Sequence, residues 1–475
     1  MKKTFFLIAA MLLSLSAFAQ LEVIYTVSNT SRNNSIVRQW GNDKYLIYTE
    51  DSSINEKFIL VDSSSQAPNA KEVSMKKRYK IKDFAVHHDT VFFIGVYFAT
   101  GFWGYFDINN VFNNGGNITY FLTDNTLPPM SIPSSGTFYS FVDFDELQVL
   151  PRPGAGSGST ELLLTGLRKN QTYSGGMPIF TTYTPCLFHV KPPYTSFDYA
   201  FNESINEKFD DIALNGNNIV VVGRENYLAS DSANILFRIF EWPNFDFTAT
   251  ISKELTRQSH TLSMSKVLIE PLGNLSGNTF ATAHYGNHNP SQGLIVELYS
   301  IQPIVNNPYL LTRNYCTFVW QSNPLATGCT LKKAAYNTSA YTFCVLQDMA
   351  SPLFSTNTST ICKVNYTNFS NITCSTSSHT SSGISINSVS NGINSNILYS
   401  GCVPYKVMLI RENVANSANC MDHGTLTVTT DNNPKYNLHE YGSLTKKSHT
   451  AARSQFSATP GTITCLAPCV RSTNK

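Results

Sequence analysis

The sequence predicts an all-β protein assembled from about seven copies of a four-stranded antiparallel unit. Three observations lead to this expectation. Amphipathic helical periodicity is scarce, short apolar runs are interrupted throughout by Asn, Gly, Asp and Ser, and two distant segments align without gaps. Repeated units of this kind bury their apolar faces by stacking on one another.

The ungapped alignment joins residues 83–95, DFAVHHDTVFFIG, to residues 211–223, DIALNGNNIVVVG. Asp83 matches Asp211, and Gly95 matches Gly223. Each segment has an alternating strand, a tight turn and a nearly continuous apolar strand, which is the pattern of a β-hairpin whose second strand is buried on both faces.

Weaker copies of the hairpin follow the same plan elsewhere. A third apolar strand follows most hairpins, and a shorter polar-aromatic strand such as residues 118–121 often comes next. The remaining hairpins are expected at residues 36–48, 144–166, 267–283, 331–345 and 384–401, and the third strands at residues 105–108, 187–190, 235–239, 294–298, 361–364 and 407–410.

Four strands in each of about seven units resemble the architecture of a β-propeller over residues 20–430. No WD dipeptide or Kelch glycine pair is present, so the resemblance is to secreted bacterial propellers in general and to no particular propeller family. Two or three β-sandwich domains are the alternative. Residues 425–430 are a candidate strand for closing the ring against the first unit, and residues 431–475 form a polar, Cys-containing C-terminal extension.

The N-terminal segment predicts export from the cytoplasm. Lys2 and Lys3 precede a short apolar run at residues 5–15, and Ala17-Phe18-Ala19 offers a small-x-small cleavage site. We therefore expect residues 1–19 to be a signal peptide and the mature chain to be periplasmic, secreted or on the cell surface. No apolar run reaches the length of about 20 residues that a membrane-spanning helix needs.

Charge and composition exclude several classes of partner. Without residues 1–19 the chain keeps 32 of its 34 basic residues against 32 acidic ones, so its formal net charge is zero. This balance gives no indication of nucleic acid or of an anionic membrane as partner. Aromatic residues make up 12% of the chain, which argues against disorder.

All ten cysteines lie after the predicted signal peptide. An even number of cysteines in an exported protein favours disulfides, and no C-x-x-C pair supports zinc. We expect most of them to be oxidised. They are Cys186, Cys316, Cys329, Cys344, Cys362, Cys374, Cys402, Cys420, Cys465 and Cys469.

Three acidic residues are the candidates for catalysis. Asp83, Asp143 and Asp211 each open the first strand of a unit and are followed by Phe or Ile. If that strand is innermost, the three carboxylates gather at one mouth of a central channel, where they suit cation binding or acid/base chemistry on a sugar. The alternative is that each Asp accepts hydrogen bonds from backbone N–H groups in its own turn.

The loops after the second strand of each unit collect on the same side of the predicted propeller. Aromatic rings with Arg and His nearby suit carbohydrate or peptide recognition. His284 and His288 are spaced as zinc ligands on a helix, but Gly286, Asn287 and Pro290 oppose a helix there. The candidate binding residues are Trp103, Tyr173, Arg224, His284, Tyr285 and His288.

The standard catalytic motifs are absent from the sequence, which contains no G-x-S-x-G, H-E-x-x-H or P-loop pattern. This favours an exported, non-catalytic protein that binds a glycan or a protein on one propeller face, with no metal and no cofactor. A carbohydrate-active hydrolase or lyase using the channel carboxylates is the first alternative. A structural or adhesive protein of the bacterial cell envelope is the second.

Overall fold

A computed structural model describes the greater part of the chain. The described ranges are 22–26, 30–51, 56–63, 69–75, 78–98, 100–123, 135–152, 160–202, 207–225, 234–247, 251–257, 266–272, 278–288, 291–304, 307–320, 328–350, 358–368, 371–378, 385–394, 396–403, 406–413, 422–425, 428–430, 436–440 and 444–463. The predicted signal peptide lies outside them. Within these ranges, no helix is long and apolar enough to cross a membrane.

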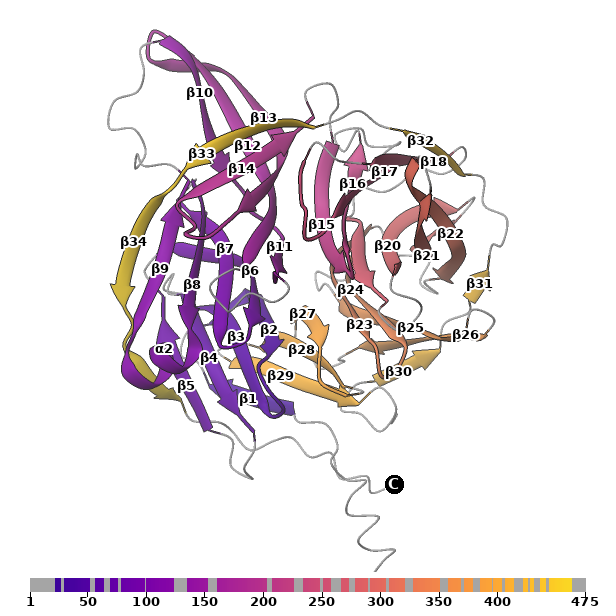
Figure 1. Cartoon of the computed structure of the whole chain (residues 1–475). Coiled ribbons are helices and arrows are strands. Elements are labelled where there is room, and N and C mark those ends of the chain that lie inside the picture. Colours follow the sequence, from indigo (N-terminus) through magenta and orange to yellow (C-terminus); the bar gives the residue numbers. More distant parts are fainter. Residues whose placement is uncertain are drawn as a thin grey trace, which may run out of the picture.

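Strands form seven antiparallel sheets, which we number by the chain order of their innermost strands, β2, β6, β11, β15, β19, β23 and β27 (Figure 1). Sheet 1 contains β2 (Thr30–Gln39), β3 (Lys44–Asp51), β4 (Glu56–Asp62) and β5 (Asn69–Ser74). Sheet 2 contains β6 (Tyr79–His87), β7 (Thr90–Tyr97), β8 (Thr100–Asp107) and β9 (Asn117–Leu122), with helix α2 (Ile108–Asn114) before β9. Sheet 3 contains β10 (Ser135–Val142), β11 (Leu147–Leu150), β12 (Glu161–Ser174), β13 (Met177–Val190) and β14 (Ser196–Phe201).

The later sheets repeat the plan. Sheet 4 contains β15 (Glu207–Asn215), β16 (Asn218–Glu225), β17 (Asn234–Glu241) and β18 (Ile251–Arg257). Sheet 5 contains β19 (Leu268–Pro271), β20 (Thr279–His288), β21 (Ser291–Ile304) and β22 (Asn307–Trp320). Sheet 6 contains β23 (Gly328–Asn337), β24 (Thr342–Ala350), β25 (Thr358–Asn368) and β26 (Asn371–Ser378). Sheet 7 contains β27 (Ser385–Asn391), β28 (Asn396–Val403), β29 (Lys406–Asn413) and β1 (Glu22–Thr26).

The all-β prediction is confirmed, and the predicted hairpins and third strands lie in strands of these sheets. The two aligned segments have the same register, because Asp83 pairs with Ile94 and Asp211 pairs with Val222. Antiparallel sheets with apolar faces are common to propellers and to β-sandwiches.

Apolar side chains fill the space between each sheet and the next. Seven buried clusters occur, and each takes its residues from two neighbouring sheets. One of them joins sheet 7 to sheet 1 through Leu398 and Leu409 on one side and Val37 and Ile47 on the other. The innermost strands also contact one another in turn, and β27 contacts β2. The contacts between sheets therefore form a closed cycle.

The C-terminal part of the chain adds one outer strand to each of six sheets, in the reverse of their chain order. We call these six strands the belt; they are drawn in yellow and orange tones at the periphery of Figure 1. β30 (Asp422–Thr425) pairs with β26, β31 (Val428–Thr430) with β22, β32 (Tyr436–Glu440) with β18, β33 (Thr445–Thr450) with β14, β34 (Ala452–Ser457) with β9 and β35 (Pro460–Ile463) with β5.

The belt corrects the prediction that residues 425–430 close the ring. Val428–Thr430 pairs with sheet 5, and β1 from the N-terminal part of the chain is the strand that completes sheet 7. The belt strands are short and mostly polar in sequence, and β33 and β34 expose most of their side chains, so they lack the apolar periodicity from which a strand is predicted.

The described cysteines do not fit the disulfide prediction. Cys186, Cys344, Cys362 and Cys402 are buried thiols that form no disulfide. Each packs in an apolar cluster between two sheets, where cysteine behaves as a small hydrophobic residue. Burial also raises the pKa of the Cys344 thiol to about 12. The side chains of the other six cysteines lie outside the described residues.

Two glycines at equivalent positions provide a test of the repeat. A Cβ on Gly95 would lie 2.0 Å from the carbonyl oxygen of Lys80, and one on Gly223 would lie 2.0 Å from that of Lys208. We expect Gly95→Ala and Gly223→Ala each to lower the free energy of unfolding by about 2 kcal/mol or more, because the backbone of the facing strand must move to make room for the added Cβ atom. Gly461→Ala is the matched control, since its nearest neighbour is the flexible Glu72 side chain. Denaturant unfolding measures the effect, and unaltered stability of both variants would contradict the shared geometry.

Candidate functional site

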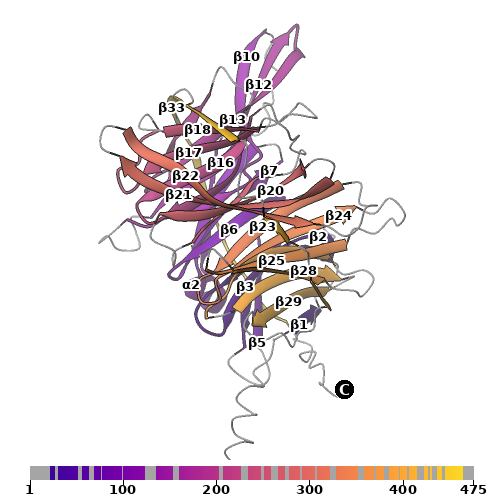
Figure 2. The ribbon, with the colours of Figure 1, turned by 90° about the vertical axis from the view of Figure 1, so that its right-hand side faces the viewer.

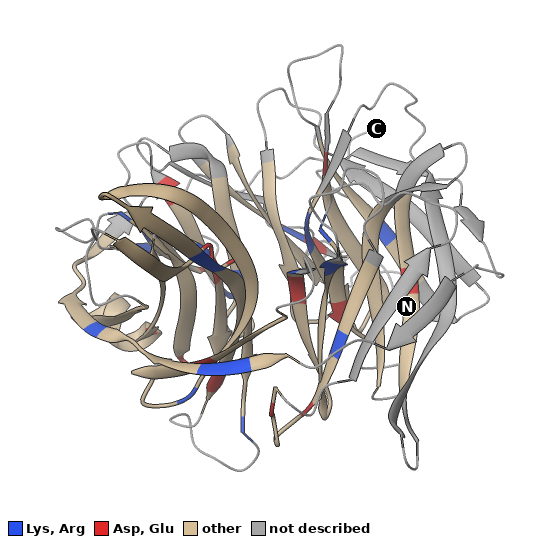
Figure 3. Cartoon of the chain, turned by 90° about the horizontal axis from the view of Figure 1, so that it is seen from above, with Lys and Arg blue, Asp and Glu red and all other residues tan. Residues whose placement is uncertain are grey.

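The innermost strands of all seven sheets line one pocket of about 510 Å³. The lining includes residues of β2, β6, β11, β15, β19, β23 and β27, so segments from the whole length of the chain meet there. Figure 3 shows both acidic and basic positions on strands in the middle of the molecule. A concave site lined by charged and apolar groups is the usual setting for ligand binding.

Four charged residues of the pocket occupy the same position in their sheets. Asp83, Asp211 and Lys333 each directly follow a break in strand register, and they pair with Ile94, Val222 and Leu346 respectively. Glu146 takes this position in sheet 3, where its backbone exchanges hydrogen bonds with Thr165. The partner of each carboxylate directly precedes a glycine, which is Gly95, Gly166 or Gly223. The bulges turn these side chains toward the pocket.

Asp83 is almost fully buried, and cations hold it ionised. Its Oδ1 lies 2.8 Å from an amino group of Arg38, and its Oδ2 lies 3.3 Å from Lys333 Nζ. Burial opposes ionisation of Asp83, but Lys333, Arg38 and the backbone N–H of Leu147 outweigh it and lower the pKa of the carboxyl. Asp83 is therefore an ionised carboxylate at neutral pH.

Asp83 and Asp211 also fasten neighbouring sheets together through the same backbone contacts. Each accepts a hydrogen bond from the N–H of the residue after it, at 2.9 Å in both cases. The second oxygen of Asp83 accepts from Leu147 N at 3.3 Å, and that of Asp211 accepts from Ile269 N at 3.0 Å. Both of these donors belong to the innermost strand of the next sheet. Asp83 and Asp211 therefore accept hydrogen bonds from backbone N–H groups, as the alternative interpretation of the sequence expects, but from the neighbouring sheet as well as from the residue that follows them.

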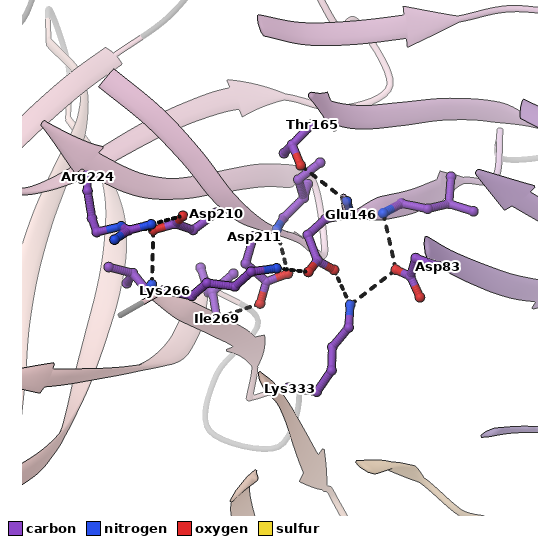
Figure 4. Close-up of polar contacts among 12 residues, drawn as sticks. Asp83, Glu146, Thr165, Asp210, Asp211, Arg224, Lys266, Ile269 and Lys333 are labelled. Carbon is purple, nitrogen blue, oxygen red and sulfur yellow. Dashed lines mark hydrogen bonds and ion pairs between the residues drawn. The ribbon is translucent and has the colours of Figure 1, made fainter. Parts of the chain in front are cut away.

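Lys333 and Lys266 surround Glu146, whose side chain is buried (Figure 4). Lys333 Nζ contacts Glu146 Oε2 as well as Asp83, and Lys266 Nζ lies 3.1 Å from Glu146 Oε1. These acidic neighbours raise the pKa of Lys333 despite its burial. The network joins side chains from sheets 1, 2, 3, 5 and 6 through ion pairs in a confined space, where such pairs are strong.

Two carboxyls of the pocket have no cation in contact among the described residues, and they hold protons at near-neutral pH. Desolvation and then the charge of Glu146 raise the pKa of Asp211 to about 7. Desolvation and then the charge of Asp211 raise the pKa of Glu270 to about 8, although Arg38 and Lys333 act in the opposite sense. Both carboxyls are half-buried and line the pocket.

The structure brings together two of the three predicted carboxylates. Asp83 and Asp211 line the pocket, whereas Asp143 is exposed, has a φ of 49° and lies before β11 outside the pocket. Glu146 is the equivalent residue, because β11 begins three residues later than the Asp-Phe pattern predicts. The glycine of each hairpin marks the position of the carboxylate on the opposite strand, and Gly166 therefore indicates Glu146. The loop inserted at residues 151–160 lengthens the spacing between Glu146 and Gly166, so the sequence alone does not reveal this relation.

Most of the predicted binding residues lie away from any open surface. Trp103 and Tyr285 are buried in apolar clusters, and His284 is buried with its Nδ1 3.9 Å from a carboxylate oxygen of Glu297. Burial of all three does not agree with direct contact to a ligand. Arg224 is buried in a bidentate pair with Asp210, with N···O distances of 2.6 and 2.9 Å. Tyr173 is half-buried on a projecting part of sheet 3. His288 ends β20, and its side chain lies outside the described residues.

The reason for this burial is the length of the strands. β7 continues to Tyr97 and β8 begins at Thr100, so Trp103 lies inside a third strand and stacks on Phe121 at 5.9 Å. Arg224 and His284 likewise lie inside second strands that extend beyond the predicted hairpins. Four of the Asp, Glu, Lys and Arg residues that line the pocket were not predicted from the sequence, and their signal is a charged residue in or directly before an innermost strand. They are Arg38, Glu146, Glu270 and Lys333.

The described residues contain no group of three His, Cys, Asp or Glu side chains that could hold a metal ion. Comparison of the chain with protein-family models and with curated proteins finds no match.

The raised pKa of Glu270 has a consequence for stability. Its folded pKa of about 8 exceeds the ordinary value of 4.5, so ionisation of the unfolded chain favours unfolding as pH rises from about 4 to about 8. We expect Glu270→Gln to remove this loss, so that its melting temperature relative to wild type rises across that interval. Glu72→Gln, on the outer strand β5, is the control. Parallel pH profiles of wild type and Glu270→Gln in thermal unfolding would refute the assignment.

Proposed function

We propose that the chain is an exported seven-bladed β-propeller that binds a ligand in its central pocket. The closed cycle of sheet contacts supports the propeller, since separate sandwich domains have no reason to join sheet 7 to sheet 1 through a shared core. The signal-like pattern of residues 1–19 supports export. A location in the periplasm, outside the cell or on its surface follows from that proposal.

The observation that carries binding is the distribution of charge in the pocket. Arg38, Lys333 and Lys266 are each engaged with Asp83 or Glu146, whereas Asp211 and Glu270 face the same space without such a partner in the described part of the chain. Carboxyl groups in a confined site attract ligand groups that donate hydrogen bonds, most strongly cationic ones.

The ligand class that fits is therefore rich in hydrogen-bond donors. Sugar hydroxyls and the ammonium group of an amino sugar meet this requirement, and so does a Lys side chain of a protein partner. A volume of about 510 Å³ lies within the range of ordinary small-molecule sites, so a short glycan end or one side chain with its neighbours is accommodated.

Amino-sugar oligomers test this proposal against matched neutral ligands. We expect glucosamine oligomers to bind more tightly than N-acetylglucosamine oligomers of equal length, because only the former present ammonium groups to Asp211 and Glu270. Asp211→Asn and Glu270→Gln should each weaken binding about tenfold or more in isothermal calorimetry, and the distant Glu72→Gln should not. Equal affinity of both oligomers, or of all variants, would contradict the pocket as the binding site.

Acid/base hydrolysis of a polysaccharide is a second candidate, and one observation favours it. The pocket holds an ionised carboxylate in Asp83 and a carboxyl with a pKa of about 8 in Glu270. Two carboxyl groups whose pKa values differ in this way suit a general base and a general acid. A screen of polysaccharide hydrolysis separates this candidate from binding alone. Turnover that is lost in Glu270→Gln while glycan affinity persists would establish catalysis.

A further inference from the structure

Part of sheet 3 projects beyond the rest of the molecule. It comprises residues 135–141 of β10, 167–174 of β12 and 177–185 of β13, and we call it the arm (Figure 2). β11 pairs only with residues 161–164 of β12, and β14 pairs only with residues 187–190 of β13. Among the described strands, the arm therefore forms no β-sheet pairing beyond its own three strands.

The arm gathers most of the exposed apolar side chains. Of the nine large hydrophobic residues that are strongly exposed in the described ranges, six lie on it, and contiguous exposed patches of this kind mark interaction surfaces. They are Phe138 (46% exposed), Tyr139 (51%), Met177 (72%), Ile179 (65%), Phe180 (63%) and Tyr183 (47%).

These side chains are ordered along the arm. Met177 lies beside the turn at Gly175 and Gly176, and Phe180 pairs with Thr172 two rungs farther back on β12. The hydroxyl-bearing rings come next, because Tyr139 pairs with Asn170 and Tyr183 pairs with Lys169. The order from the tip is therefore aliphatic and phenyl groups, then tyrosines, then a cation.

Positive charge lies at the base of the arm. Residues 135–142 and 167–186 contain Arg168 and Lys169 but no Asp or Glu. Arg168 lies over the ring of Phe201 at 3.9 Å, and Lys447 of the belt approaches the same ring at 5.5 Å. The chain as a whole has no excess charge to attract an anionic surface, but the fold gathers three cations at this place.

The polar side chains of the arm bond to one another. Thr137 and Thr172 hydroxyls lie 3.1 Å apart, the Asn170 amide donates to Thr182 and Thr184, and Tyr173 donates to Gln171. Groups that are already hydrogen-bonded lose less when they leave water. The arm can thus enter a less polar medium at a lower free-energy penalty than its Thr and Asn content suggests.

We propose that the arm docks on an anionic lipid bilayer, with Met177, Ile179 and Phe180 entering the interfacial region. Phe138 pairs with Gln171, three residues from the end of β12, which places it about 10 Å from the tip at roughly 3.3 Å per residue. This matches the insertion depth of interfacial segments, about 5–10 Å.

The remaining order of residues agrees with this placement. Tyrosines are favoured at the headgroup level, and the cations of the base face anionic headgroups. Deeper insertion is opposed because the edges of the arm pair with no other described strand, and unpaired backbone groups are costly in hydrocarbon. A second copy of the chain is a poorer occupant, since two arms with only positive charge repel each other.

Vesicle sedimentation of the intact mature protein tests the proposal. We expect binding to vesicles of equal phosphatidylcholine and phosphatidylglycerol, and at least a tenfold fall in partition for the triple variant Met177→Ser, Ile179→Ser, Phe180→Ser. The matched control is Phe98→Ser with Ile393→Ser, two exposed residues away from the arm, which should leave partition unchanged. Circular dichroism verifies that each variant is folded.

Two further variants distinguish insertion of the arm into lipid from self-association of the chain. Lys169→Gln with Lys447→Gln should reduce the preference for phosphatidylglycerol while leaving weak binding to pure phosphatidylcholine. The emission of Phe180→Trp should shift to the blue and be quenched by brominated lipid, whereas that of Phe98→Trp should not. Absence of vesicle binding, or equal loss in the control pair, would overturn the proposal. A dimer in ultracentrifugation that the triple variant dissociates, without vesicle binding, would assign the arm to a second copy instead.

Discussion

The hydrogen bonds from Asp83 and Asp211 to the inner strand of the next sheet determine how the centre of the molecule is built. Each carboxylate sits at a bulge, bonds the N–H that follows it and spans the gap to the neighbouring sheet. A buried carboxylate needs compensating charge, and Arg38 and Lys333 supply it for Asp83. The charged lining of the pocket is thus partly a consequence of fastening the sheets. Asp211 and Glu270 are the members whose carboxyl groups have no cation in contact among the described residues.

The belt solves a different problem of the same architecture. Edge strands present unpaired backbone groups that invite aggregation, and short strands with charged side chains reduce this risk. In six of the seven sheets a short belt strand takes the edge position outside the larger strands. The seventh receives β1, so both ends of the chain are used to cover edges. The arm is the place where sheet 3 extends past this protection, and its tip carries large apolar side chains. Exposure at that point is consistent with a surface that has a partner.

The hairpins could be predicted because strand, turn and buried strand are local patterns, as in residues 83–95 and 211–223. The carboxylate of sheet 3 could not, because an insertion separates Glu146 from Gly166 and an exposed Asp143 precedes a Phe at the expected spacing. The sequence predicts a loop at Trp103, but strand ends depend on tertiary pairing, and β8 begins earlier than its local sequence indicates. The belt pairs with strands up to 393 residues away, from β35 to β5, and no periodicity in a short polar strand reveals such partners.

The four described cysteines also depend on tertiary structure. Their burial between sheets, and not disulfide formation, accounts for their positions.

Closure of the cycle between sheet 7 and sheet 1 is the claim on which the pocket and the proposed propeller depend. Ser35 and Ser400, from these two sheets, have hydroxyl oxygens 3.1 Å apart and are both buried. Replacing both by Cys places two thiols within reach of a disulfide. If the cycle is closed, mild oxidation links position 35 to position 400, or to the native Cys402, as detected by peptide mass spectrometry under non-reducing conditions. A folded double variant in which neither link forms would contradict the closed cycle and favour separate sandwich domains.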